Sequence, residues 1–156
     1  MNSLQVIGVL GAAAIVGLGI GTLSSRTGGG GEGTPDQLVA ATTVKYNLCG
    51  IARYNCVVDG DTLWIGDVKV RIADIDAPEI GSPRCSQELE RGEQAKRRLL
   101  ELVNEGPFEV RQLGDRDADK YNRKLRVLIR NGQSLGDQLV SEGLARTWGG
   151  RREPWC

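Results

Sequence analysis

Acidic side chains and one arginine gather in two short segments of the chain. The first is Asp59-Gly60-Asp61, at the start of an apolar and β-branched run, and the second is residues 71–79. The charged side chains of the second segment are Arg71, Asp74, Asp76 and Glu79. Like charges packed this closely repel one another unless a cation or another partner offsets them. Taken alone, Asp-Gly-Asp is more often a plain turn than a site. Oxygen ligands without histidine or cysteine select calcium or magnesium over zinc or copper, so any metal bound here would be a hard cation.

A third cluster lies in a polar loop expected between two strands. It reads Asp119-Lys120-Tyr121-Asn122-Arg123. One interpretation is a solvated hairpin tip, because loops of this composition usually face water. The other is a phosphate site: a phosphodiester transition state carries negative charge on its non-bridging oxygens. A hard dication and two permanently charged guanidiniums, Arg71 and Arg123, would form a sufficient clamp for that charge.

The composition narrows the chemistry further. The chain has 156 residues with 20 basic and 20 acidic side chains, and it contains no histidine. Mechanisms that need an imidazole base, nucleophile or ligand are therefore excluded, including Ser-His-Asp triads and most zinc sites. The zero net charge does not exclude a nucleic-acid substrate, because a basic groove can exist inside a neutral protein.

The elements that would position these clusters follow from the apolar pattern. Short apolar or β-branched runs predict five strands, and apolar residues at helical spacing predict two helices. The strands are expected at residues 56–58, 62–65, 68–72, 108–112 and 125–129, and the helices at residues 86–104 and about 135–144. Gly106-Pro107 ends the first helix. Five short strands and two helices predict an α+β domain built on a small five-stranded barrel, closed or partly open.

The hairpin at Gly66-Asp67 raises a question about the site. A two-residue turn there places Arg71 opposite Thr62, and strand alternation then puts Arg71 on the face away from Asp61. A β-bulge would bring the two side chains back to one face. The sequence leaves both arrangements open.

The N-terminal part differs in character from the rest. Residues 4–23 are uncharged and mostly apolar, and 20 helical residues at about 1.5 Å each would just cross a hydrocarbon core. We expect residues 1–23 to be a membrane anchor or a cleaved signal segment, residues 24–43 a glycine-rich linker and residues 44–156 the folded domain. The domain is then expected outside the cytoplasm, either membrane-anchored or periplasmic or extracellular. Arg26, just after the segment, slightly favours the opposite orientation.

The four cysteines are Cys49, Cys56, Cys85 and Cys156. Their spacing contains no C-x-x-C, and without histidine a zinc site would need all four thiolates from scattered positions. Disulfides in an oxidising compartment fit this pattern, and buried free thiols in a cytosolic protein are the alternative.

Together the three clusters resemble the staphylococcal nuclease (thermonuclease) family, in that family's order and with similar intervals, over roughly residues 55–148. The resemblance implies an OB-fold endonuclease that uses calcium to hydrolyse DNA and RNA with little sequence preference. It implies products with a 3′-phosphate and a 5′-hydroxyl. The alternative is a non-catalytic OB-fold module that binds nucleic acid or a protein partner on a membrane tether. We expect a monomer in either case.

The resemblance also assigns roles to individual residues. The carboxylates of Asp61 and Asp76 and the backbone carbonyl of Ala77 would bind Ca²⁺, and Glu79 would orient or deprotonate the attacking water. The phosphate and substrate contacts would come from Arg71, Lys120, Tyr121, Arg123 and Arg151. The family usually has threonine where Ala77 stands and glycine where Asn122 stands. Asparagine tolerates a positive φ better than most residues, so the turn should survive.

A disulfide between Cys85 and Cys156 is likewise implied by the resemblance, because the corresponding segments of the family both border the nucleotide pocket. The same interpretation pairs Cys49 with Cys56. The Cys85–Cys156 disulfide would hold Arg151 and Arg152 where a substrate phosphate could meet them.

Overall fold

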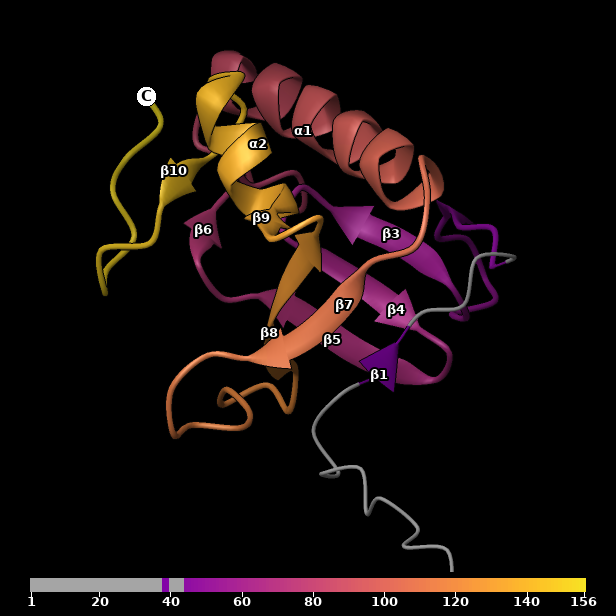
Figure 1. Cartoon of the computed structure of the whole chain (residues 1–156). Coiled ribbons are helices and arrows are strands. Elements are labelled where there is room, and N and C mark those ends of the chain that lie inside the picture. The colour runs from indigo at the N-terminus through magenta and orange to yellow at the C-terminus, as the bar shows by residue number, and fades with distance from the viewer. Residues whose placement is uncertain (1–37, 40–43) are drawn as a thin grey trace, which may run out of the picture. The chain divides into compact units, whose positions relative to one another are not determined.

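The structure is a computed structural model that describes residues 38–39 and 44–156 (Figure 1). Its helices are α1 (Ser86–Asn104) and α2 (Leu135–Ser141). The longer strands are β3 (Cys56–Asp59), β4 (Thr62–Ile65), β5 (Val68–Ile72), β7 (Glu109–Gln112) and β8 (Lys124–Arg130). The two-residue strands are β1 (Leu38–Val39), β2 (Asn47–Leu48), β6 (Ile75–Asp76), β9 (Gln133–Ser134) and β10 (Arg146–Thr147). The predicted helix over 86–104 and the five predicted strands are therefore present, with strand ends that differ by a residue or two.

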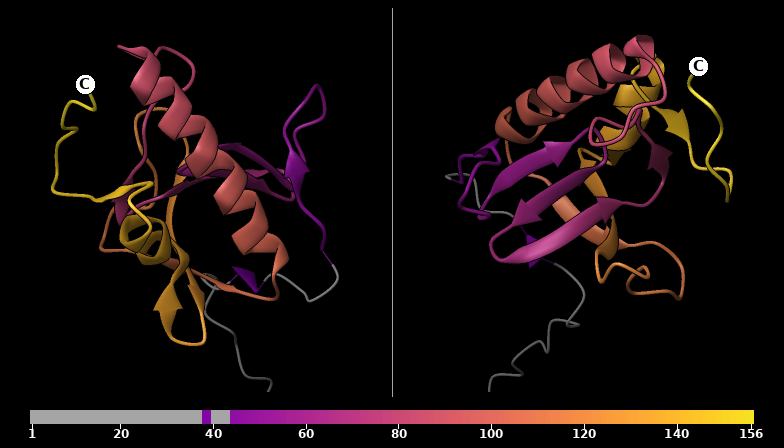
Figure 2. Two further views of the ribbon diagram at one scale, coloured as in Figure 1. Left: turned by 90° about the horizontal axis from the view of Figure 1, so that it is seen from above. Right: turned by 180° about the vertical axis from the view of Figure 1, so that it is seen from behind.

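The strands form a mixed sheet rather than a ring. The order is β1-β7-β8-β5-β4-β3-β2, with β9 paired to β8, and β5 and β8 run parallel. The pairings of the described residues do not close this path, so the closed five-stranded barrel is not seen in the hydrogen bonding. Both helices lie on the same side of the sheet (Figure 1 and Figure 2). The fold is thus an α+β sheet-and-helix arrangement with three short strands, β1, β2 and β9, added to the five expected.

The core lies between the helices and the sheet. The face of α1 that the sequence pattern predicts is buried, with Ala95, Leu99 and Leu102 fully shielded from water. Val57 and Leu63 of the sheet belong to the same buried cluster. This packing fixes α1 against β3 and β4, which carry the first acidic cluster at their junction.

Two glycines let the acidic segments approach α1 closely. A Cβ atom at Gly60 would lie 2.6 Å from the Cβ of Ala95 and 2.8 Å from the Cβ of Ala77. A Cβ atom at Gly92, on α1, would lie 2.8 Å from the carbonyl oxygen of Pro78. Contacts under 3.0 Å are not tolerated, so both positions need glycine for this packing. The turn before Asp61 and the loop after Asp76 therefore rest directly on the helix.

The C-terminal part of the chain returns to the same edge. Strand β10 pairs antiparallel with β6, which places Arg146 opposite Asp76, and the Trp148 amide donates to the Asp74 carbonyl at 2.8 Å. The chain is then joined to the start of α1 by a disulfide between Cys85 and Cys156, with a Cα separation of 6.2 Å. A second disulfide joins Cys49 to Cys56, at 4.9 Å. Both pairs are those implied by the resemblance.

The predicted hydrophobic segment at residues 4–23 and nearly all of the predicted linker lie outside the described residues. None of the helices that the structure does describe is long and apolar enough to cross a membrane.

Candidate active site

Arg71 lies at the centre of the acidic cluster. Its Nη2 is 3.2 Å from Asp61 Oδ2 and 3.8 Å from Asp76 Oδ1. Its Nη1 donates to the carbonyl oxygens of Ile72 and Ile75 at 2.7 and 3.1 Å. The residue is 8% exposed, and these four contacts fix the plane of its guanidinium. Arg71 is therefore a preorganised positive charge at the end of β5.

The Arg71 and Asp61 side chains meet although the Gly66-Asp67 hairpin has a two-residue turn. Arg71 does pair with Thr62, as a two-residue turn requires, yet its side chain still reaches Asp61. Asp61 belongs to the turn before β4, where strand alternation does not govern the side chain, and its carbonyl accepts from the Ile72 amide at 2.8 Å. A register shift also occurs in β3 between Val57 and Asp59. Of the two arrangements that the sequence left open, the structure therefore has the one in which the Arg71 and Asp61 side chains meet.

The two candidate metal carboxylates are almost completely buried. Asp61 is 4% exposed and Asp76 is 3% exposed. Asp61 Oδ1 accepts from the Thr62 hydroxyl at 2.8 Å, and its Oδ2 accepts from the Ala77 amide at 3.4 Å. Burial raises the pKa of Asp76 above its usual value, although the charge of Arg152 opposes this. Such buried carboxylates need cationic partners, and the described residues supply arginines.

Asp59 is a further, partly buried acid beside this pair. Its Oδ1 accepts from the Asp61 amide at 3.1 Å. Burial, and next the charge of Asp61, raise the pKa of Asp59 to about 7. The raised pKa favours the protonated form of Asp59, and protonation reduces the repulsion between the two aspartates of the Asp-Gly-Asp motif.

Arg152 reaches the acids from the C-terminal segment. Its Nε donates to Asp76 Oδ1 at 2.9 Å, and its Nη1 donates to Glu79 Oε2 at 3.1 Å. Its Nη2 lies 3.9 Å from Asp61 Oδ2. Arg151, which the resemblance placed at the substrate, instead has an 83% exposed side chain and pairs with Glu153. Of the two adjacent arginines, it is Arg152 that the structure brings to the acidic cluster.

Glu79 is held in its charged form. Burial by itself would raise the pKa of Glu79, but hydrogen bonds from the Gly81 amide and from Arg152 outweigh this and lower it. The Gly81 amide donates to Glu79 Oε1 at 3.1 Å. Glu79 is therefore a carboxylate at neutral pH, as a residue that accepts a proton from water must be.

Glu88 holds the loop that carries Glu79. It is buried on the first turn of α1, and it accepts from the Arg84 amide at 2.7 Å and the Glu79 amide at 3.4 Å. Glu88 was not among the residues predicted for the site. A glutamate three residues after a helix N-cap commonly turns back to satisfy amides before the helix, and Glu88 stands three residues after Cys85, so that spacing was an available signal.

The third cluster is joined to the first through Thr62. Arg123 Nη1 donates to the Thr62 hydroxyl at 3.3 Å, and that hydroxyl donates to Asp61. Arg123 Nε donates to Asp119 Oδ2 at 2.7 Å, so Asp119 holds the guanidinium in place. Asn122 has a φ of +58°, the positive value for which asparagine is suited. The loop is therefore tied to the acidic cluster and is more than a free hairpin tip.

A cavity of about 290 Å³ lies beside this loop. Arg71 and Arg123 both line it, together with Lys120, Tyr121 and Trp148. The Arg71 guanidinium lies 5.2 Å from the centre of the Trp148 ring, and the Lys120 ammonium lies 5.0 Å from the centre of the Tyr121 ring. Arg116 is a third arginine in the lining, and a cavity with three arginines, a lysine and two aromatic rings suits a phosphate attached to a base.

The oxygen donors of the acidic cluster are of the kind that a hard cation prefers. No group of three or more Asp, Glu or Cys side chains within 44–156 is arranged as a metal cluster. Asp61, Asp76 and Glu79 nevertheless all approach one cationic group, the Arg152 guanidinium. Three carboxylates around one positive charge fit the oxygen-only preference of calcium, although the arginine occupies that place here.

An α+β domain in which two arginines converge with buried acids is the arrangement of a staphylococcal-nuclease-like protein. The family model described as "Staphylococcal nuclease homologue" matches residues 69–154, and the chain belongs to that family. The match includes the second and third clusters, and Asp61 lies before it.

Several curated proteins are similar to this chain. The SPbeta prophage-derived endonuclease YokF of Bacillus subtilis is 43% identical over 95 residues, which are 57% of this chain and 31% of that protein. Endonuclease YncB of the same organism is 39% identical over 95 residues, 57% of this chain and 44% of that protein. An uncharacterized endonuclease of Haemophilus influenzae is 30% identical over 113 residues, 69% of this chain and 56% of that protein. The matches thus span 31% to 56% of the relatives' own lengths.

Proposed function

We propose that the chain is a calcium-dependent nuclease that hydrolyses phosphodiester bonds of DNA and RNA, leaving 3′-phosphate and 5′-hydroxyl ends. One observation carries the proposal: a continuous chain of polar contacts links Arg123 to Thr62, Thr62 to Asp61 and Asp61 to Arg71, at 3.3, 2.8 and 3.2 Å. Both candidate phosphate arginines are thereby tied to the candidate metal carboxylate. The endonuclease names of the relatives support the same reaction class.

The two arginines would bind the scissile phosphate. A guanidinium stays charged at any working pH and presents a fork that matches phosphate oxygens. Arg71 and Arg123 line one cavity, so a single phosphate placed there could contact both. Since such donors act mainly on the charge that develops in the transition state, their principal effect is expected on turnover.

Glu79 would position and deprotonate the attacking water. Its pKa lies below the usual value, so it is ionised and can accept a proton near neutral pH. Asp61, Asp76 and the carbonyl of Ala77 would hold the calcium ion, which would stabilise negative charge on the phosphate. The buried positions of Asp61 and Asp76 keep those oxygens in a fixed geometry.

Little sequence preference is expected. The proposed polar contacts are to phosphate or metal, and such contacts carry no base information. Tyr121 and Trp148 offer rings on which any base could stack.

The test is cleavage of plasmid DNA, single-stranded DNA and RNA by the purified protein in calcium and then in excess EGTA. We expect cleavage of all three with calcium, 3′-phosphate ends by end-group analysis, and loss of activity with EGTA. Activity that persists in EGTA would refute the metal assignment, and binding without cleavage would identify a non-catalytic module.

We further propose that the domain works outside the cytoplasm, anchored or exported through residues 4–23. The two disulfides support this, since disulfides persist in oxidising compartments. An export-dependent reporter fused after Cys156 tests the location, and absence of reporter activity would argue for a cytoplasmic domain.

A further inference from the structure

The place between the candidate metal carboxylates is taken by a side chain of the protein itself. The Arg152 guanidinium contacts Asp76 at 2.9 Å, Glu79 at 3.1 Å and Asp61 at 3.9 Å, each through a different nitrogen. One planar cation thus faces three carboxylates that come from two separate loops. Its side chain is 38% exposed, so it lies at the mouth of the site, while Arg71 is buried behind it.

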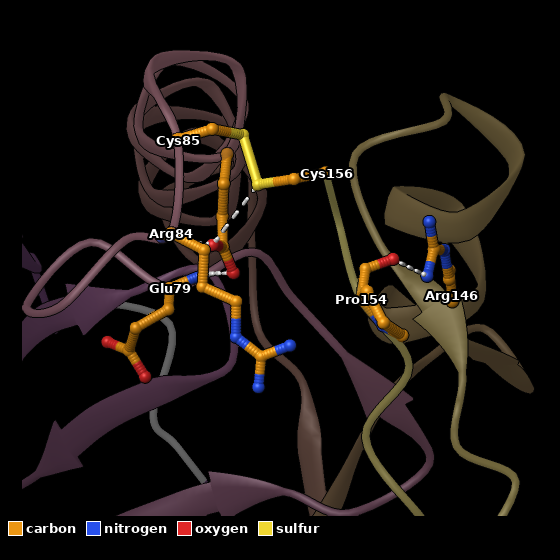
Figure 3. Close-up of a disulfide and its surroundings, with 7 residues drawn as sticks. Glu79, Arg84, Cys85, Arg146, Pro154 and Cys156 are labelled. Carbon is orange, nitrogen blue, oxygen red and sulfur yellow. Dashed lines mark hydrogen bonds between the residues drawn. A yellow bond between two sulfur atoms is a disulfide. The ribbon is translucent and has the colours of Figure 1, made fainter.

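The segment that carries Arg152 is fastened on both sides. Before it, β10 pairs with β6 and the Trp148 amide bonds to Asp74. After it, Trp155 is 8% exposed, and its indole N–H donates to Asp76 Oδ2 at 3.3 Å. The chain then ends in the disulfide of Cys156 with Cys85 (Figure 3). Arg152 is therefore delivered to the acids by a constrained backbone.

Further contacts hold the same segment in place. The Arg146 guanidinium lies 3.8 Å from the centre of the Trp155 ring. Arg146 Nη1 also donates to the Pro154 carbonyl at 3.0 Å, a hydrogen bond drawn in Figure 3. Trp155 is thereby fixed beside Asp76. A loose surface arginine would show none of these supports, so the placement of Arg152 is a built feature of the fold.

A divalent cation and this guanidinium would compete for the same oxygens. Asp76 Oδ1 accepts from Arg152 at hydrogen-bonding distance, and a cation on that atom would stand against a like charge. Opposite charges a few ångströms apart near a protein surface attract appreciably, and like charges repel by similar amounts. Arg152 must move away before the cation can be fully bound.

We propose that Arg152, which Glu79 also holds, is an internal counter-cation that competes with the divalent metal for Asp61 and Asp76 and thereby sets the metal affinity of the site. The disulfide-fastened segment 148–156 supplies a high local concentration of this competitor. The inference rests on the proposed function, because it assumes that these acids bind the metal. It adds that Arg152 lowers the affinity of the site for the metal.

The test is calorimetric titration of metal-free protein with Ca²⁺ in the absence of substrate. Arg152→Gln should bind Ca²⁺ about tenfold more tightly than wild type, which corresponds to about 1.4 kcal/mol. The matched control is Arg151→Gln, which removes the same charge one residue earlier from an 83% exposed side chain paired with Glu153, and its Kd should stay within about twofold of wild type. Circular dichroism checks that the variants are folded.

A second measurement needs no variant. If Ca²⁺ expels Arg152, amide hydrogen exchange in peptides covering 149–154 of the wild-type protein should accelerate on adding Ca²⁺. The double variant Cys85→Ser with Cys156→Ser should also bind Ca²⁺ more tightly, and adding Arg152→Gln to it should give little further gain.

The outcomes separate the two proposals. Equal Kd values for wild type and Arg152→Gln, or weaker binding by Arg152→Gln, would overturn the role of Arg152 while leaving the metal site intact. Unchanged exchange at 149–154 in Ca²⁺-saturated protein would overturn it as well. If no variant binds Ca²⁺ even at millimolar concentration, the metal-dependent function itself fails, and this inference fails with it.

Discussion

Replacement of Arg123 by lysine distinguishes the two interpretations of residues 119–123, a catalytic loop and a solvated hairpin tip. The guanidinium donates through Nε to Asp119 and through Nη1 to Thr62, so it bridges its own loop and β4 while lining the cavity. A lysine keeps the charge, but its single nitrogen cannot hold Asp119 and also present a fork to phosphate. Arg123→Lys would therefore keep the positive charge but lose the geometry of the contacts to Asp119 and to phosphate.

The expected magnitude follows from these contacts. Loss of one preorganised donor to a transition-state oxygen typically costs 10²- to 10³-fold in kcat, or about 3–4 kcal/mol, and we expect Arg123→Lys to fall in that range. The Arg123 side chain is 20% exposed and the lysine charge stays near Asp119, so the unfolding free energy should fall by only about 1 kcal/mol or less. Activity and stability should therefore respond very differently.

The assay is cleavage of a fluorophore-quencher DNA oligonucleotide in saturating calcium, with kcat and KM measured separately and a urea melt on the same preparation. The matched control is Arg97→Lys on α1. The Arg97 side chain is 58% exposed and pairs with Glu93, so this variant should retain kcat within about threefold. Wild-type kcat in Arg123→Lys would refute the reasoning and show that residues 119–123 are only a loop tip.

Three further variants test other parts of the structure. Glu79→Gln should lower kcat by at least about 10²-fold while calorimetric Ca²⁺ affinity changes by only a few fold, and equal loss of both would make Glu79 a metal ligand instead of a base. Replacing Cys85 and Cys156 by serine opens a loop with a separation of 71 residues, and urea denaturation should show a loss of up to about 4 kcal/mol; no loss would mean that the disulfide does not constrain the unfolded chain. Arg98→Gln removes the α1–α2 ion pair with Glu142 and should cost about 1 kcal/mol at pH 7. Hydrogen bonding to Arg98 lowers the pKa of Glu142 in the folded state, so this stabilisation is present at neutral pH and disappears as the pH falls through the folded value; a pH-independent difference in urea melts would contradict the pair.

Much of the fold could be predicted because its signals are local. The apolar spacing in residues 86–104 and the Gly106-Pro107 stop give α1 its observed ends, and the Gly66-Asp67 turn gives the observed pairing of Thr62 with Arg71. The short strands could not be predicted, because two residues carry no periodic pattern. The parallel pairing of β5 with β8 joins segments more than fifty residues apart, which no local pattern reports.

The site was less predictable where it depends on tertiary contacts. Alternation along a strand says nothing about a residue in the adjoining turn, which is why Asp61 and Arg71 meet despite the register. Adjacent arginines 151 and 152 are equivalent in sequence, and only the contacts of Trp155 and the Cys85–Cys156 disulfide determine which of them faces the acids.

The rigidity of the candidate site comes from the hydrophobic core. Gly60 and Gly92 allow the turn before Asp61 and the loop after Asp76 to pack directly on α1. Ala95, on the face of α1 that receives the turn, is fully buried. The acids are therefore held in place by packing, and the repulsion between them is offset by arginines instead of being relieved by movement. Because burial of unpaired carboxylates is costly, the counter-charges are part of what makes this packing stable without a metal. A cation that enters would then replace an existing partner in a preformed site, so its net affinity is the difference between two charge pairings rather than the full attraction of the acids.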